Sequence, residues 1–228
     1  AAAEVTGDDP VLILYTGGTT GESKGALHSH HSLYMGMLNQ SIAERIVLTD
    51  VYMLTGQMFH IPVALAMNYM AHGCPVVLIN FDAKLALDVI QQERVSAFLG
   101  ITTMINWMMA VEGFEDYDLS SLRNFQYGGG PMPRSVVEAA LKAFPCTMIQ
   151  GYGQTEGMTM TFLSQEDHQR AIAGDHPERL GSCGREGFVS EIRVVDPEGE
   201  PVPRDGQTAG EIVVRSEANM LGYWRRPD

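Results

Sequence analysis

Residues Tyr15–Gly25 read YTGGTTGESKG and follow a short apolar run, Val11–Leu14, that is typical of a buried strand. Positions 16–24 hold three glycines, three threonines and one lysine, Lys24. Glycine lets successive backbone N–H groups point at one anion, threonine hydroxyls add donors, and lysine adds a mobile positive charge. The stretch therefore predicts a loop that holds a polyphosphate.

This loop is not the common Walker loop. The Walker pattern G-x-x-x-x-G-K-[ST] needs glycine before the lysine and a hydroxyl residue after it, whereas here Ser23 precedes Lys24 and Gly25 follows it. Taken alone, the stretch leaves open a plain flexible turn between two strands.

Two further glycine-rich motifs lie downstream. Residues 127–133 read YGGGPMP, and residues 150–157 read QGYGQTEG after a strand-like run at Cys146–Ile149. With all three motifs in this order, the chain strongly resembles the adenylate-forming (AMP-binding) superfamily of acyl-CoA synthetases, peptide-synthetase adenylation domains and luciferases. The motifs of that family are close to Y-[ST]-[SG]-G-[ST]-T-G-x-P-K-G, G-[GA]-[GA]-P-[ML] and Y-G-x-T-E.

The composition is that of a globular enzyme domain. The 228 residues are 45% hydrophobic and 19% charged, with a net charge of −13. No Lys/Arg cluster occurs beyond Arg225-Arg226, which argues against a nucleic-acid partner. Polar residues interrupt the apolar stretch 61–79, so we expect no membrane span.

The cysteines and the N-terminus favour a cytoplasmic protein. Cys74, Cys146 and Cys183 are widely spaced and form no C-x-x-C motif, which is typical of reduced thiols. The first residues, AAAEVTGDD, have neither the basic nor the apolar region of a signal peptide. The oligomeric state is open.

Strand-like and helix-like segments alternate along most of the chain, and this predicts an α/β fold with a largely parallel sheet flanked by helices. Ligands of such sheets bind at the carboxyl ends of the strands, and each glycine-rich motif is expected to follow a strand. Asp82 is a candidate N-cap of a helix that ends at Glu93. The expected strands are 11–14, 25–28, 50–54, 76–79, 96–99, 122–127, 146–149, 190–195 and 210–215, and the expected helices are 32–45, 62–71, 82–93, 102–111 and 133–144.

The texture changes after about Gln165, where short strands and turns dominate. We therefore expect an α/β subdomain for nucleotide and acyl binding at 1–165 and a truncated β-rich subdomain, a distorted barrel in the family, at 166–228. The resemblance covers the whole chain but only the centre of the family's large N-terminal domain. We expect the N-terminal part, the ribose-binding Asp and the C-terminal lid domain with its catalytic lysine to be missing, and the chain alone to bind nucleotide weakly without turnover.

The resemblance implies a role for each motif residue. Lys24, Thr155 and Glu156 are the expected catalytic residues, with Glu156 also the ligand of Mg²⁺. Tyr152 is expected to lie on the adenine, and His60, after Phe59, to lie with Gly128 at the acyl substrate. The residues expected to bind ATP or AMP are Thr16, Gly17, Gly18, Thr19, Thr20, Gly21, Lys24, Gly129, Gly130, Gln150, Gly151, Tyr152 and Thr155.

Ordinary structural roles remain alternatives at several of these positions. Gly128–Gly130 can be a plain turn, Tyr152 and His60 core residues, and Glu156 a surface carboxylate. Ser23 replaces the family's usual proline, and Gly17 a frequent serine. The run His28–His31 contains three histidines, but without a second ligand cluster we favour no metal site there.

The expected function is that of an ATP-dependent acyl-CoA synthetase fragment, which joins a carboxylic acid to AMP with release of pyrophosphate and then to coenzyme A. A medium- or long-chain fatty acid is favoured because Met104, Met108 and Met109 share a predicted helix and suit an adaptable tunnel. The alternatives are an aryl-CoA ligase, an acyl-AMP ligase or luciferase-like enzyme, and a non-catalytic nucleotide-binding module. The first hypothesis places the protein in fatty acid metabolism, with adenylation of the acid as its first step.

Overall fold

The computed structural model describes residues 4–16, 22–56, 58–59 and 61–226. The chain forms two compact units, each assembled from separate segments. The smaller unit draws its residues from 1–39, 153–161 and 186–228, and the larger from 40–152 and 162–185. The subdomain boundary at 165/166 stays a prediction.

The larger unit is an α/β structure around a largely parallel sheet. The strands of this sheet are β3 (Tyr52–Leu54), β4 (Val76–Leu78), β5 (Ala97–Leu99), β6 (Asn124–Gly128), β7 (Thr147–Gln154), β8 (Met158–Leu163) and β9 (Arg185–Glu186). The last two residues of β7, residues 158–161 of β8 and Glu186 of β9 are counted with the smaller unit. Their order is β4-β3-β5-β6-β7-β8-β9, and the four pairs from β4 to β7 are parallel. This confirms the predicted fold class.

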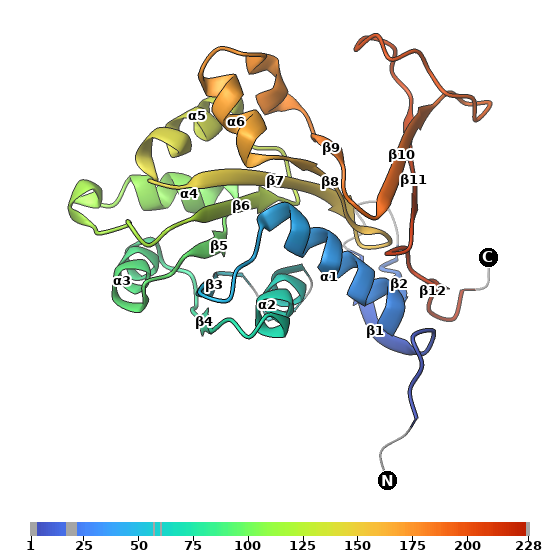
Figure 1. Ribbon diagram of the computed structural model, residues 1–228, viewed down its shortest axis with the longest axis horizontal. Coiled ribbons are helices and arrows are strands. Elements are labelled where there is room, and N and C mark those ends of the chain that lie inside the picture. Colours follow the sequence, from blue (N-terminus) through green and yellow to red (C-terminus); the bar gives the residue numbers. More distant parts are fainter. Residues whose placement is uncertain (1–3, 17–21, 57, 60, 227–228) are drawn as a thin grey trace. The chain divides into compact units, whose positions relative to one another are not determined.

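Helices cover both faces of this sheet. They are α2 (Ile61–Ala71), α3 (Ala83–Glu93), α4 (Thr102–Met109), α5 (Arg134–Ala143) and α6 (Gln165–Ile172), with short 3₁₀ turns at Phe114–Asp116 and Pro177–Gly181. Figure 1 shows α5 and α6 on one side of β6 and β7 and α2 on the other. A parallel sheet covered in this way is buried on both faces.

Strand β6 shows how the two faces are filled. Phe125 and Tyr127 point into the core formed with α3 to α6, and the Phe125 ring stacks on Phe98 with the centroids 4.8 Å apart. The alternate residues of the strand, Asn124 and Gln126, are buried as well, although they are polar. Because side chains of a strand alternate between its faces, the polar pair lies on the face opposite Phe125.

Local capping signals set two helix starts. The Asp82 carboxylate accepts a hydrogen bond from the Leu85 N–H at 2.9 Å, which confirms the predicted N-cap of α3. Ser164 caps α6 in the same way, accepting from the Asp167 N–H at 3.1 Å. We did not predict α6, although the Ser164-x-x-Asp167 spacing is a capping signal.

The smaller unit holds two antiparallel sheets. One consists of β1 (Pro10–Tyr15), β2 (Gly25–Ser29) and β12 (Gly222–Tyr223), in that order. The other is the pair β10 (Ser190–Val195) and β11 (Glu211–Ser216). Helix α1 (His30–Glu44) begins in this unit and ends in the larger one.

Two expectations about strands were wrong. The run 11–14 does form a strand, but only Leu14 is buried, while Val11 and Ile13 are 42% and 37% exposed. This strand is an edge of the antiparallel sheet rather than a member of the parallel one, which explains the exposure. The strand expected to end at 149 runs on to Gln154, so the first five residues of the third motif, 150–154, lie within β7 and only residues 155–157 follow it.

No helix among the described residues is both long enough and apolar enough to cross a lipid bilayer.

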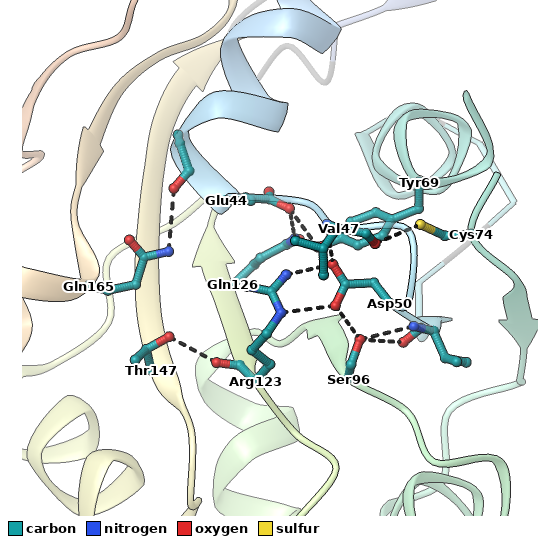
Figure 2. Close-up of polar contacts among 12 residues, drawn as sticks. Glu44, Val47, Asp50, Tyr69, Cys74, Ser96, Arg123, Gln126, Thr147 and Gln165 are labelled. Carbon is teal, nitrogen blue, oxygen red and sulfur yellow. Dashed lines mark hydrogen bonds and ion pairs between the residues drawn. The ribbon is translucent and has the colours of Figure 1, made fainter. Parts of the chain in front are cut away.

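A buried polar network lies in the larger unit beside the start of β3 and β6 (Figure 2). Arg123 holds Asp50 with two hydrogen bonds, Nε to Oδ1 at 2.9 Å and Nη2 to Oδ2 at 2.5 Å. Ser96 Oγ also donates to Asp50 Oδ1 at 2.7 Å. Burial favours the neutral acid, but the contacts of Arg123, Val47 N–H and Ser96 outweigh it and lower the pKa of Asp50.

Glu44, at the end of α1, is fully buried, and its hydrogen-bond partners within the described part of the chain are uncharged donors. Its carboxyl group accepts hydrogen bonds from the side-chain amides of Gln40 and Gln126 and, at 2.8 Å, from the Tyr69 hydroxyl. Burial raises the pKa of Glu44 to about 7, and the hydrogen bonds from Gln40 and Tyr69 only partly oppose it. Glu44 therefore takes up a proton near neutral pH.

We predict that Glu44→Gln flattens the pH dependence of the free energy of unfolding between pH 4.5 and about 7. The folded chain keeps the Glu44 proton in this window while the unfolded chain releases it, so stability falls as the pH rises. The loss reaches on the order of 3 kcal/mol above the window. Urea titrations at a series of pH values measure it.

Glu93→Gln is the matched control, because Glu93 is an exposed carboxylate at the end of α3. That variant should keep the pH slope of the parent chain. An unchanged slope in Glu44→Gln would show that Glu44 stays ionised throughout.

Candidate active site

The predicted phosphate loop joins the two strands of a hairpin. Tyr15 of β1 pairs with Gly25 of β2, and the Thr16 N–H donates to the Lys24 carbonyl at 2.8 Å. The Lys24 N–H returns a hydrogen bond to Thr16 Oγ1 at 3.2 Å, and Ser23 Oγ donates to the Thr16 carbonyl at 2.5 Å. These contacts close the two ends of the loop and fix the backbone of Lys24. The five predicted loop residues Gly17, Gly18, Thr19, Thr20 and Gly21 lie outside the described residues.

Thr155 and Glu156 form the turn between β7 and β8, and two segments hold their backbone. The His28 ring donates from Nε2 to the Thr155 carbonyl at 2.8 Å, since a carbonyl can only accept. The Met220 N–H donates to the Glu156 carbonyl at 2.7 Å. His28 is fully buried, and burial lowers its pKa, so the ring is held neutral.

Lys24 and Glu156 meet the same aromatic side chain, Tyr223 of β12. The Lys24 ammonium lies 4.9 Å from the centroid of the Tyr223 ring, and the Tyr223 hydroxyl donates to Glu156 Oε1 at 2.6 Å. The hydrogen bond to Glu156 raises the pKa of Tyr223, so this hydroxyl stays a donor. The smaller unit thus brings two residues of different motifs, Lys24 and Glu156, into one cluster.

The second motif lies in the larger unit, at the end of β6. Gly128 pairs with Gly151 of β7, and a Cβ atom on Gly128 would lie 2.3 Å from the Gly151 carbonyl oxygen. Only glycine fits there. Gly129 has a φ of +72°, which also favours glycine, and Gly130 has open space around it. The Gly128–Gly130 turn therefore presents bare backbone next to Gly151.

Tyr127, the residue before this turn in β6, is held in the core by a hydrogen bond to α6. Its hydroxyl donates to His168 Nε2 at 2.8 Å, while His168 Nδ1 donates to the Ser164 carbonyl at 2.7 Å. The carbonyl fixes the proton on Nδ1, which leaves Nε2 as the acceptor. Both side chains are buried, and burial lowers the pKa of His168, so the neutral ring keeps this arrangement.

Gln150 and Tyr152 flank Gly151 in β7. The Gln150 Oε1 atom is buried and has no hydrogen-bond donor within the described residues. Tyr152 is partly exposed. His60 lies outside the described residues, and its neighbour Phe59 is 64% exposed.

Three contact residues were missed by the sequence analysis: Tyr223, His168 and, in its contact with Thr155, His28. Tyr223 stands in the sequence Gly-Tyr-Trp, which carried no assigned role, and His168 lies on the unpredicted helix α6. Two signals were available in the sequence: His28 stands near the end of a predicted strand, and the Ser164-x-x-Asp167 spacing marks the start of α6. Neither signal tells which residue His28 or His168 contacts.

The residues around Tyr223 in the smaller unit and those around the glycine turn in the larger unit suit different parts of a ligand. A mobile ammonium, a carboxylate and the hydroxyls of Thr16 and Thr155 suit a metal-bound polyphosphate. In the larger unit, the bare glycine backbone of residues 128–130 and the Gln150 amide oxygen, which has no partner among the described residues, suit a planar base with an amino group.

The sequence of the chain is similar to those of known CoA ligases. The chain is 32% identical over 225 residues to a feruloyl-CoA synthase of Amycolatopsis sp, covering 97% of this chain and 44% of that protein. It is 30% identical over 230 residues to the long-chain-fatty-acid–CoA ligase FadD13 of Mycobacterium tuberculosis (strain CDC 1551 / Oshkosh), covering all of this chain and 43% of that protein. The chain thus spans less than half of the length of these relatives.

Solved structures agree. The inhibitor-bound N-terminal domain of FACL13 from Mycobacterium tuberculosis matches with a TM-score of 0.87 at 29% identity, over 100% of this chain and 55% of that one. The o-succinylbenzoate CoA synthetase MenE of Bacillus subtilis, in complex with its acyl-adenylate intermediate, matches with a TM-score of 0.84 at 26% identity, over 100% of this chain and 46% of that one. The family model of the AMP-binding enzyme matches residues 1–224, and the chain therefore belongs to the AMP-binding enzyme family.

Proposed function

We propose that the chain is the central part of an ATP-dependent acid–thiol ligase. In the proposed reaction a carboxylate oxygen attacks the α-phosphorus of ATP, and the bond to pyrophosphate breaks. The thiol of coenzyme A then attacks the acyl carbon of the acyl-AMP, and AMP leaves. The observation that carries this proposal is the cluster in which Lys24 and Glu156, from two family motifs, contact one tyrosine.

The first step accumulates negative charge on the leaving pyrophosphate, and Lys24 is the residue proposed to stabilise it. The backbone of Lys24 is fixed by Thr16, while its ammonium rests on a ring rather than on a carboxylate. Thr155 is proposed to contact the α-phosphate, and Gly17, Gly18, Thr19, Thr20 and Gly21 to hold the β- and γ-phosphates. Fixed donors of this kind act where charge develops.

Mg²⁺ is the proposed cation of the site, and Glu156 its proposed ligand. Hard cations prefer carboxylate oxygens together with phosphate oxygens and water, and Glu156 supplies such an oxygen beside Lys24 and Thr155. When bound, the ion neutralises phosphate charge and orients the polyphosphate. The hydrogen bond to Oε1 from Tyr223 leaves Oε2 of the same carboxylate for the cation.

The adenine is proposed to bind at the turn of the larger unit. The backbone around Gly128, Gly129 and Gly130 is free of side chains, and Gly151 lies on the adjacent strand. Tyr152 would lie on the base. Gln150 Oε1, which is buried and has no partner in the part of the chain that the structure describes, can accept from the exocyclic amino group of adenine.

The acid is proposed to be a medium- or long-chain fatty acid, with an aryl acid as the alternative. The ligase relative FadD13 supports the fatty acid, and the feruloyl-CoA synthase relative supports the aryl acid. The methionines of α4 give little support for the fatty acid, because Met108 is fully buried and packs in the hydrophobic core. Gly128 and His60 remain proposed contacts of the acyl group.

Two other functions remain as alternatives to the ligase. An acyl-AMP ligase or luciferase-like enzyme would use the same cluster but no coenzyme A for acyl transfer. A non-catalytic nucleotide-binding module is less favoured, because Lys24, Thr155 and Glu156 are all present and each is held by a hydrogen bond. A cytoplasmic location and the absence of nucleic-acid partners stay predictions.

We predict that Glu156→Gln abolishes the effect of Mg²⁺ on ATP binding. The amide keeps the shape of the side chain but loses the charge that attracts the cation, so ATP affinity in the presence of Mg²⁺ should fall about tenfold, equivalent to ~1.4 kcal/mol. Calorimetric titration of the chain with ATP, with and without Mg²⁺, measures this.

Glu211→Gln provides the matched control, since Glu211 is an exposed carboxylate at the start of β11 in the same unit. The control should bind ATP like the parent chain. Retention of the full Mg²⁺ effect by Glu156→Gln would exclude Glu156 as the metal ligand.

Acyl-adenylate mimics with short, medium, long and aryl acyl groups should bind this chain with unequal affinity, and we predict that the medium- or long-chain mimics bind best. Titration calorimetry with non-hydrolysable mimics gives the ranking. Preference for the aryl mimic would favour the aryl-CoA ligase, while equal binding of all four would show that the acyl pocket is not formed by these residues.

A further inference from the structure

Tyr223 is held at a defined position beside the phosphate loop. Strand β12 pairs with β2 so that Tyr223 lies opposite Ala26, two residues after Lys24. The hydrogen bonds on either side, from Leu221 N–H to the Leu27 carbonyl and from Trp224 N–H to the Gly25 carbonyl, are both 2.7 Å long. The backbone of Tyr223 is therefore fixed on both flanks.

The two ends of the Tyr223 side chain contact residues of opposite charge. The ring face carries the Lys24 ammonium at 4.9 Å, and the hydroxyl donates to Glu156 Oε1 at 2.6 Å. A hydrogen bond from a hydroxyl to a carboxylate is short and strong, and a cation is attracted to the face of an aromatic ring. Both contacts are favourable, and neither of them neutralises a charge.

Within the described residues, no ion pair joins Lys24 to Glu156. Two flexible side chains of opposite charge in one cluster would otherwise neutralise each other. The ammonium contacts the face of the Tyr223 ring, and the carboxylate contacts its hydroxyl. The same segment also holds the backbone of Glu156, through the hydrogen bond from Met220 N–H to its carbonyl at 2.7 Å.

We propose that Tyr223 is a positioning residue that keeps the Lys24 ammonium and the Glu156 carboxylate apart and aimed at a metal-bound triphosphate. The hydroxyl orients Glu156 through Oε1, so that Oε2 faces the cation, and the ring supports Lys24 beside the phosphates. This inference rests on the proposed function, because it assigns Tyr223 to the same nucleotide site.

A second contact ties the same C-terminal segment to the loop. Arg226 Nη2 donates to Glu22 Oε2 at 2.7 Å. Both side chains are well exposed, so this ion pair contributes little to stability. The Tyr223 contacts carry the positioning role.

Two substitutions separate the roles of the hydroxyl and the ring. Tyr223→Phe keeps the ring under Lys24 and removes the donor to Glu156, whereas Tyr223→Leu removes both. We expect Tyr223→Phe to weaken ATP binding about tenfold in the presence of Mg²⁺, the effect of losing one hydrogen bond to a charged group, and to leave binding without Mg²⁺ unchanged. Tyr223→Leu should weaken binding under both conditions.

Calorimetric titration with ATP, with and without Mg²⁺, is the readout, and thermal unfolding of each variant checks the fold. Tyr117→Phe is the matched control, because the Tyr117 hydroxyl also donates to a carboxylate, Asp88 Oδ1 at 3.1 Å, in the larger unit. This control should bind ATP like the parent chain in both conditions.

The outcomes are distinguishable. If the parent chain binds Mg²⁺-ATP and Tyr223→Phe binds it equally well, the positioning role is wrong and the proposed function stands. If Tyr223→Phe loses affinity equally with and without Mg²⁺, Tyr223 has only a structural role. If the parent chain binds no ATP in either condition, the nucleotide site proposed for these residues fails, and the role of Tyr223 fails with it.

Discussion

The parallel pairing of β6 with β7 is the constraint on which the glycine turn of the larger unit depends. Gly128 lies so close to Gly151 that a Cβ atom would come within 2.3 Å of a carbonyl oxygen. Any side chain at Gly128 would push the two strands apart and displace the backbone that carries Tyr152. Just before this point, the stacked rings of Phe98 and Phe125 hold β6 against β5, its neighbour on the side away from β7. Apolar packing and the absence of a side chain thus fix the turn jointly.

The register of β6 is fixed by opposite chemistry on its two faces. Phe125 and Tyr127 enter the apolar core, whereas Gln126 reaches the buried carboxyl of Glu44. A slip of one residue would exchange these faces, placing Gln126 among aromatic rings and Phe125 against a carboxyl group. Burying Glu44 costs stability, as its raised pKa shows, but the arrangement makes the wrong register far less favourable.

Local patterns predicted most strands and helices, and they failed where the deciding contact is distant in sequence. The Asp82 cap and the run 190–195 depend on neighbouring residues, and the structure confirms both. The run 11–14 has the composition of a buried strand, but its exposure depends on which sheet it joins. The expected end of the strand at 149 was wrong because β7 continues beside its neighbours, with Gly151 paired to Gly128 and Gly153 so close to Met158 that a Cβ atom would not fit.

The motifs identified the candidate residues but did not predict the contacts that hold their side chains in the site. Lys24 and Glu156 were predictable as types, since phosphate needs a cation and Mg²⁺ needs a carboxylate. The residue that lies between them, Tyr223, belongs to no motif that carried a role, and it arrives only because β12 pairs with β2. A direct lysine–glutamate pair would satisfy both charges and compete with any ligand. A neutral donor with an aromatic face satisfies both more weakly, so the cluster stays ordered and still has charge to give to a ligand.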